Sequence, residues 1–225
     1  MGLINFGAPE EIVAFLKDIM KLDIFVEGGT YKGDTAKKMS NKFRKVYTIE
    51  KSDIMFNEAK ENLKDIKNII LLKGDTREHF PYIIRKNDNI LFWLDAHYSG
   101  GETYGEEDEC PLMEELEIIF EYNKNKNFVI LIDDARLFLA PPPYPHKIEN
   151  WPSLINIVQV LPNNWELIVF EDVIYIFPKE ISQDFKSFIQ KAVTKGWKQY
   201  GKNNQATFIK GLKIAIRGLL NGRIL

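Results

Sequence analysis

The stretch that decides the fold is "VEGGTYKGDT", residues 26–35. It follows a short apolar run, residues 23–27, and opens a short helical pattern, residues 35–43. Glycine lets a backbone approach a ligand closely, and a helix start after a strand is a common ligand site. The spacing is not the dinucleotide fingerprint Gly-x-Gly-x-x-Gly, because Thr30 and Tyr31 stand where glycine is required. The pattern is instead acid-x-Gly-x-x-x-Gly-x-Thr, formed by four residues: Glu27, Gly29, Gly33 and Thr35.

Apolar runs follow this loop at intervals that leave room for helices: 45–50, 68–75, 89–95 and 127–134. Helical patterns lie before and between the runs: 9–22, 52–64 and 110–122. Continuous Val, Ile, Leu and Phe separated by helices predict a parallel sheet that is covered on both faces.

The later part of the chain changes character. Residues 165–178 contain two β-rich runs joined by Glu171 and Asp172, which predicts a tight antiparallel hairpin. We therefore expect an α/β, Rossmann-like fold. Its central sheet would have seven strands, mostly parallel, and would end in an antiparallel hairpin with helices on both faces.

Composition places the chain among ordinary globular proteins. Of its 225 residues, 45% are hydrophobic and 28% are charged, and the formal net charge is -2. This balance argues against a nucleic-acid partner, which usually requires a strongly basic domain. The single cysteine, Cys110, excludes an intrachain disulfide and a multi-thiolate metal site. The sequence shows neither a signal-peptide pattern nor an apolar run long enough to span a bilayer, so we expect a cytoplasmic protein.

Two segments are expected. Residues 1–200 would form one catalytic domain, and residues 201–225 a basic C-terminal helical extension. The extension has two interpretations. It packs on the domain or on a partner subunit, forming a homo-oligomer, or it binds a membrane surface.

Acids stand at the ends of consecutive predicted strands. Glu50 ends the second strand, where it can accept hydrogen bonds from both hydroxyls of a ribose. Asp75 and Thr76 follow the third strand, where a carboxylate can accept from an adenine amine. Each could also be a solvated strand-end residue. With Glu27 on the first strand, however, three successive acids would face one crevice.

At this point the chain resembles the class I S-adenosylmethionine-dependent methyltransferases over about residues 20–178. Three further segments are most similar to the macrocin-type O-methyltransferases, which act on sugar hydroxyls: "WLDAHYSGG" (93–101), "CPLMEELEII" (110–119) and "LIDDARLF" (131–138).

The resemblance implies that Glu27 and Gly29 contact the methionine part of the cofactor, Glu50 the ribose, and Asp75 with Thr76 the adenine. The full set of cofactor-binding residues that it implies is Glu27, Gly28, Gly29, Gly33, Thr35, Glu50, Asp75, Thr76 and Asp95.

Methyl transfer to a hydroxyl needs help in removing the proton of the acceptor. A general base near neutrality or a divalent cation supplies that help. His97 suits the first task, because histidine titrates near neutral pH. Asp95, Asp133 and Asp134 suit the second, as hard oxygen ligands for Mg²⁺.

In the resembling sugar O-methyltransferases, acids at the ends of these same two strands hold magnesium, and a base two residues beyond the first acid takes the proton. Several relatives carry a carboxylate where His97 stands, so His97 could instead bind the metal. It could also be a non-catalytic histidine. The acids Asp133 and Asp134 could be a helix cap and a solvated carboxylate.

Two further stretches are weaker signals. "APPPYPH" (140–146) resembles the motif of amino-methyltransferases, but Pro141 stands at its polar position and the segment follows the fifth strand. We interpret it as a stiff loop of the acceptor pocket, with His146 and Trp151 as substrate contacts. The acidic run 105–109 is interpreted as a solvated loop, with a mobile lid as the alternative.

The sequence thus predicts an S-adenosylmethionine-dependent, magnesium-assisted O-methyltransferase that acts on a small hydroxylated acceptor, a sugar or glycoside. One alternative is a metal-independent methyltransferase with His97 alone as the base. The other is a non-catalytic subunit of a larger assembly that binds S-adenosylmethionine.

Overall fold

The computed structural model describes residues 7–98, 108–123, 126–198 and 210. Its internal contacts divide the chain into two units, Met1–Ile181 and Ser182–Leu225. In the second unit, residues 182–198 form a helix. The predicted extension 201–225 lies outside the described residues except for Lys210, which is helical and exposed. Within the described part of the chain, no helix combines the length and apolar character needed to cross a membrane.

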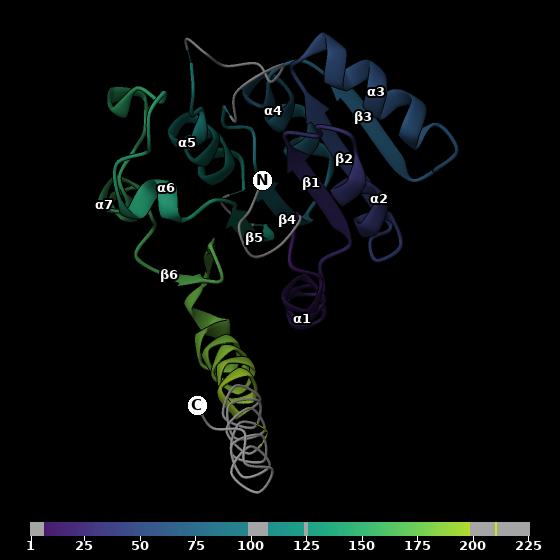
Figure 1. The fold of residues 1–225 in the computed structure, drawn as a ribbon. Helices are drawn as coiled ribbons and strands as arrows, with labels where there is room; N and C mark the ends of the chain where they lie inside the picture. Colours follow the sequence, from purple (N-terminus) through teal and green to yellow (C-terminus); the bar gives the residue numbers. More distant parts are fainter. Residues whose placement is uncertain (1–6, 99–107, 124–125, 199–209, 211–225) are drawn as a thin grey trace, which may run out of the picture. The chain divides into compact units, whose positions relative to one another are not determined.

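The first unit is built on a sheet of seven strands in the order β3-β2-β1-β4-β5-β7-β6 (Figure 1). Strands β1 to β5 are parallel to one another, and β7 is antiparallel to both β5 and β6. This confirms the predicted mostly parallel sheet with a terminal hairpin. The strands are β1 (Ile24–Gly28), β2 (Lys45–Glu50), β3 (Ile69–Lys73), β4 (Asn89–Leu94), β5 (Asn127–Ile132), β6 (Trp165–Phe170) and β7 (Val173–Pro178).

Helices lie before and between the strands. The helices are α1 (Glu10–Met20), α2 (Asp34–Ser40), α3 (Asp53–Leu63), α4 (Thr76–Lys86), α5 (Leu112–Tyr122), α6 (Arg136–Leu139) and α7 (Leu154–Gln159), with short 3-10 turns at Ile148–Asn150 and Lys179–Ile181. The four with a helical sequence pattern, α1, α2, α3 and α5, begin close to where that pattern places them. Ser52 caps its helix, because its side chain accepts a hydrogen bond from the backbone N of Met55.

Both faces of the sheet are buried, as expected for parallel strands that are apolar at successive positions. On one face, Ile90 and Phe92 of β4 belong to the core that includes Phe80 of α4 and Leu116 of α5. On the other face, Leu91 and Trp93 are fully buried as well. Helix α1 contacts β5 and α2 contacts β2, and both helices are buried along one side.

The third strand is shorter than predicted. We expected residues 68–75, but β3 ends at Lys73, because Gly74 turns the chain at φ +133°. Asp75 then caps α4 by accepting a hydrogen bond from the backbone N of Arg77. The residues that follow β1 to β5 all meet at one edge of the sheet, where ligands of open α/β sheets bind.

Candidate active site

A cavity of about 960 Å³ opens at this edge of the sheet. Eight of the predicted site residues line it: Gly29, Thr35, Glu50, Asp75, Thr76, Asp95, His97 and Asp133. Fifteen residues that were not predicted as site residues also line it, among them Tyr31, Lys51, Arg77, Asp108 and Pro111. The volume lies at the upper end of the range typical for small-molecule and cofactor pockets.

The glycine loop forms one wall because its backbone comes unusually close to the neighbouring strand end. Gly29 has φ +86°, and a Cβ there would lie 2.2 Å from the backbone O of Asp95. Gly33 has φ +87° and precedes α2, where a Cβ would meet the side chain of Leu63 at 2.8 Å. A Cβ at Gly28 would lie 2.9 Å from the side chain of Thr76. Gly29 therefore shapes the cavity, while Gly28 and Gly33 allow the elements around it to pack.

Glu27 lies in the last part of β1 and is 1% exposed. Its Oε2 accepts a hydrogen bond of 2.5 Å from the hydroxyl of Thr48, which in turn lies 2.6 Å from that of Thr30. Burial raises the pKa of Glu27 to about 8, and the nearby charges of Asp95 and Glu50 act in the same direction. The carboxyl at this strand end is therefore mostly protonated at neutral pH.

Glu50, at the end of β2, holds the backbone around it. Its Oε2 accepts from the backbone N of Tyr31 and its Oε1 from the backbone N of Ser52, both at 2.8 Å. Burial raises its pKa, although these hydrogen bonds oppose the shift. The backbone of Lys51 gives a third hydrogen bond to this carboxyl group, so one of its four acceptor positions is left for a hydroxyl donor.

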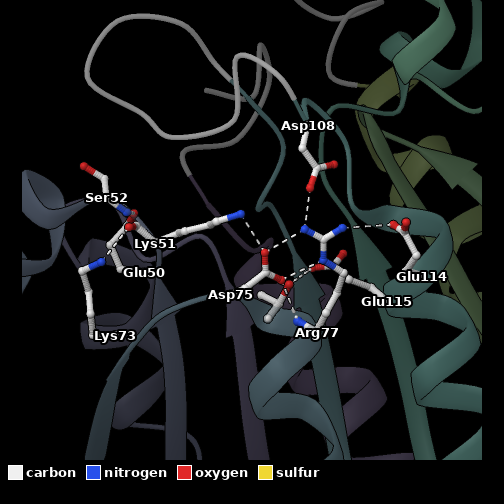
Figure 2. A network of polar contacts seen from close by, with 10 residues as sticks. Glu50, Lys51, Ser52, Lys73, Asp75, Arg77, Asp108, Glu114 and Glu115 are labelled. Carbon is white, nitrogen blue, oxygen red and sulfur yellow. Dashed lines mark hydrogen bonds and ion pairs between the residues drawn. The ribbon is translucent and has the colours of Figure 1, made fainter.

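Asp75 belongs to a group of charged side chains that we call the Arg77 cluster: Lys51, Asp75, Arg77, Asp108 and Glu114 (Figure 2). The Oδ1 of Asp75 accepts from the backbone N and the Nε of Arg77, both at 2.9 Å. Its Oδ2 accepts from the Nη2 of Arg77 and the Nζ of Lys51, both at 2.8 Å. Burial acts to raise the pKa of Asp75, but these donors outweigh it and hold the pKa well below its usual range.

Thr76 faces away from Asp75 toward helix α5. Its hydroxyl donates a 2.5 Å hydrogen bond to Oε1 of Glu115, which is 2% exposed. Burial raises the pKa of Glu115 to about 7. The sequence reasoning missed Glu115, although helical spacing places it on the same stripe as the buried Leu112, Leu116 and Ile119.

His97 and Asp134 form a buried pair at the ends of β4 and β5. The Nε2 of His97 lies 3.0 Å from Oδ2 of Asp134 and 3.7 Å from Oδ1 of Asp95. Burial acts to lower the pKa of His97, but the hydrogen bond with Asp134 and the surrounding carboxylates outweigh it and raise the pKa. For Asp134, burial acts to raise the pKa, while His97 and Arg136 outweigh it and lower the pKa.

Asp134 is supported from the terminal hairpin. Its backbone is left-handed, at φ 55°, and its Oδ1 accepts a 2.7 Å hydrogen bond from Nη1 of Arg136. The same Nη1 contacts Asp172, which lies in the turn between β6 and β7. The Oδ1 of Asp172 also accepts a hydrogen bond of 3.0 Å from the backbone N of Arg136. The backbone carbonyl of Asp172 accepts one of 2.8 Å from the backbone N of Ala135. The predicted hairpin thus fixes the partner of His97.

The three predicted magnesium ligands are close together, but they do not form a ligand set. Oδ1 of Asp134 accepts from the guanidinium of Arg136 and Oδ2 faces Nε2 of His97, so the positive charge of Arg136 opposes a cation at this carboxylate. Oδ1 of Asp133 accepts from the backbone N of Asp134. Burial raises the pKa of Asp133 to about 8 and that of Asp95 to about 6. Over the ranges that the structure describes, no three His, Cys, Asp or Glu side chains are placed to hold a metal ion. As arranged, these residues do not fit the ion.

An aromatic wall stands beside His97. The ring of Trp151 lies edge-on to His97 at a centroid distance of 5.4 Å and to His146 at 5.1 Å. Both residues predicted as acceptor contacts thus lie next to His97 or one ring away from it, but neither lines the cavity. Glu109 holds this wall, because its carboxylate accepts from Nε1 of Trp151 at 2.6 Å and from the backbone N of Lys147 at 3.0 Å.

Glu109 corrects the interpretation of the acidic run 105–109 as a solvated loop. Residues 105–107 lie outside the described part, and Glu109 is only 2% exposed. It is buried because its donors come from the loop before α7, more than thirty residues along the chain. No pattern in the sequence links the two segments.

Comparisons with known proteins give a fold and no closer relative. No protein-family model and no curated protein matches the sequence. A protein assigned as an O-methyltransferase from Klebsiella pneumoniae has a similar structure, with a TM-score of 0.56, 13% identity, and coverage of 79% of this chain and 83% of that one.

Two further solved structures are similar at the same level. One is a protein assigned as a caffeoyl-CoA O-methyltransferase from Staphylococcus aureus, with a TM-score of 0.52, 14% identity, and coverage of 78% and 86%. The other is the S-adenosylhomocysteine-bound methyltransferase PaMTH1 of Podospora anserina, with a TM-score of 0.53, 14% identity, and coverage of 77% and 90%. The chain has the Rossmann-like fold of class I methyltransferases.

Proposed function

We propose that this protein is an S-adenosylmethionine-dependent O-methyltransferase. One observation carries the proposal: His97, which is hydrogen-bonded to the buried Asp134, lines the cavity that the strand ends form. This edge is where nucleotide-type ligands of open α/β sheets bind. The similar Podospora anserina structure, which is bound to S-adenosylhomocysteine, supports the choice of cofactor.

The chain's residues would divide the work along the cavity. The backbone of Gly29, which lines the cavity, would take the methionine end of the cofactor, together with the ionised form of Glu27, which is buried in the same strand end. Glu50 would accept from a ribose hydroxyl with its remaining acceptor position. The predicted cofactor-binding roles of Gly28 and Gly33 would be indirect, because both allow packing around the cavity.

His97 would act as the general base. If Nε2 donates its proton to Asp134, the neutral ring keeps its basic lone pair on Nδ1. The acceptor hydroxyl would lose its proton to the imidazole as its oxygen bonds to the methyl carbon. The bond from carbon to sulfur breaks, its electron pair stays on sulfur, and S-adenosylhomocysteine is released. Asp134 would stabilise the imidazolium that forms.

A small hydroxylated acceptor, a sugar or glycoside, is the finer part of the proposal. Its support is that the aromatic residues Trp151 and His146 lie beside His97. We derive no step through a metal ion. Magnesium assistance by Asp95, Asp133 and Asp134 remains a prediction of the sequence, and it would require a cation to bind beside the guanidinium of Arg136.

Calorimetry tests the proposal first. S-adenosylmethionine and S-adenosylhomocysteine are titrated into the protein with Mg²⁺ and with EDTA. We expect both ligands to bind in both buffers, and Glu50→Ala to weaken binding by about 1–3 kcal/mol if its hydrogen bonds are made in the buried site. Absence of binding by the wild-type chain would refute the methyltransferase assignment.

Turnover is tested separately by a screen of nucleotide sugars, glycans and small alcohols, with release of S-adenosylhomocysteine as the readout. Product formation that survives EDTA would exclude a required metal ion. Product formation that needs Mg²⁺ would show that the carboxylates rearrange around an ion. Cofactor binding with no turnover on any acceptor would favour the non-catalytic subunit.

A further inference from the structure

The guanidinium of Arg77 is held along its whole edge by carboxylates. Its Nε and Nη2 donate to Asp75, its Nη2 also donates to Asp108 at 2.5 Å, and its Nη1 lies 3.5 Å from Glu114 (Figure 2). These acceptors come from the start of α4, the segment before α5 and α5 itself. All of the donors lie in the plane of the group. Once its edge is occupied, a guanidinium has only its two flat faces to offer a ligand.

Arg77 is also placed to meet a ligand. It lines the cavity together with Lys51, Asp108 and Pro111, at the end formed by β2 and β3. Its side chain is 25% exposed although all three of its nitrogens are engaged. The exposed part of the side chain therefore presents surface to the cavity but few free hydrogen-bond donors.

The residues beside Arg77 are committed elsewhere. Each oxygen of Asp75 already accepts two hydrogen bonds, which fills the acceptor positions of a carboxylate. The hydroxyl of Thr76 donates to Glu115. To accept from an adenine amine, Asp75 would have to lose Lys51 or Arg77, and both are charged partners at hydrogen-bond distance.

We propose that the flat face of the Arg77 guanidinium is the surface on which the nucleoside base of the bound cofactor stacks, and that Asp75 is a positioning residue that holds it. Guanidinium planes stack well on nucleobases, and this contact is tolerant of the groups on the base edge. The inference rests on the proposed function for the identity of the ligand. The inference replaces the predicted role of Asp75, accepting a hydrogen bond from the adenine amine, with the role of holding Arg77 in place.

Arg77→Lys tests the stacking surface, because lysine keeps the charge and loses the plane. S-adenosylhomocysteine and S-inosylhomocysteine, whose base lacks the amine, are titrated by calorimetry. We expect Arg77→Lys to weaken both ligands by a similar factor of about ten or more. Arg85→Lys is the matched control, since Arg85 is on the same helix and contacts the ring of Tyr122 outside the cavity. Its affinities should equal those of the wild type.

Asp75→Asn and the double variant test the positioning role. If Asp75 acts through Arg77, the single variant weakens both ligands, and the double variant is no weaker than the worse single variant. Thermal unfolding of each variant shows whether it is folded.

Three outcomes would overturn the inference. In one, folded Arg77→Lys binds both ligands as the wild type does. In the second, Asp75→Asn weakens the adenine ligand alone, and its effect adds to that of Arg77→Lys. Either result would leave the proposed function standing. In the third, the wild-type protein binds neither ligand, and the inference falls together with the proposed function.

Discussion

The two ends of the cavity differ in the pKa shifts of most of their carboxylates; the exception near His97 is Asp134, whose pKa is lowered by His97 and Arg136 against the effect of burial. In the Arg77 cluster, Asp75 is surrounded by donors and its pKa is held below the usual range. Around His97, the pKa of Asp133 is raised to about 8 and that of Asp95 to about 6, chiefly by burial. Glu27, at the adjoining strand end, has its pKa raised to about 8 for the same reason.

The contrast indicates what each end does. The Arg77 cluster is electrostatically complete before a ligand arrives, so it can offer a fixed surface at no cost in rearrangement. The end around Glu27 and His97 holds acids that are costly to ionise while buried. A ligand that carries positive charge, as the sulfonium and ammonium groups of S-adenosylmethionine do, would favour their ionised forms. If the proposed function holds, base stacking would take place at the first end and proton transfer at the second.

His97→Ala should give the largest effect and would separate the two ends most clearly. We expect turnover on an acceptor from the screen to fall by about 10²–10⁴, the usual contribution of a positioned base. Affinity for S-adenosylhomocysteine should hardly change, because the imidazole faces the acceptor. Steady-state rates and calorimetry on the same variant check both statements.

His79→Ala is the control, since His79 lies on α4 and its Nε2 contacts the carbonyl of Lys73. Two outcomes would contradict the role of His97 as the base. Recovery of most of the rate in excess Mg²⁺ would identify His97 as a metal ligand. Normal turnover in the folded fraction would identify it as a structural residue.

Gly29→Val would disrupt the close approach of the glycine loop to the backbone of Asp95, which forms one wall of the cavity. The new Cβ would lie 2.2 Å from the carbonyl O of Asp95, in a left-handed conformation that valine disfavours. We expect the free energy of unfolding to fall by about 3 kcal/mol and cofactor binding to be lost from the remaining folded protein. Urea denaturation and calorimetry measure the two effects.

Gly196→Ala is the matched control, because a Cβ at Gly196 meets nothing within 4 Å. Its stability should match or exceed that of the wild type. A Gly29→Val protein that unfolds and binds like the wild type would show that the loop is free to move away from Asp95.

Glu27→Gln tests the raised pKa of Glu27 through the pH dependence of the free energy of unfolding. Because the folded-state pKa is about 8 against an ordinary value of 4.5, the folded protein keeps a proton that the unfolded chain loses. The stability contributed by this proton is fully present below about pH 4.5 and is lost as pH rises through about 8. We expect the decline in unfolding free energy between pH 5 and pH 8 to be smaller in the variant, by about 3–4 kcal/mol.

Urea denaturation at several pH values measures the decline. Glu58→Gln serves as the control, since Glu58 forms a surface ion pair with Lys32 and should leave the slope unchanged. Parallel curves for the wild type and Glu27→Gln would mean that Glu27 is already ionised in the folded protein.

The sheet could be predicted from the sequence because each central strand is a continuous apolar run, and burial on both faces leaves few other structures for such runs. The hairpin could be predicted as well, because two β-rich runs are separated by only two residues, Glu171 and Asp172. In the structure these two residues adopt positive φ values, 49° and 65°, which are typical of a two-residue hairpin turn. The acids at strand ends followed from the topology, because parallel strands end at one edge.

The partners of those acids could not be predicted. Arg77 meets Asp108 and Glu114 only because helices α4 and α5 pack together. Asp134 is held by Arg136 and Asp172, a contact that depends on how the hairpin closes. Local sequence states which residue types are present, and tertiary packing decides which of them meet.

Glu109 has a consequence for how the protein can change over evolution. It holds the loop before α7 through the backbone of Lys147 and the buried ring of Trp151. Between and beside these anchor points, Leu139, Tyr144 and Ile148 are mostly exposed. We expect these exposed positions to accept substitution without loss of stability, which unfolding of a Tyr144→Ala variant would check. Because one carboxylate, that of Glu109, anchors the loop, the exposed positions of the loop could change in related sequences while the residues around His97 stay the same. Such changes could alter which acceptor is used.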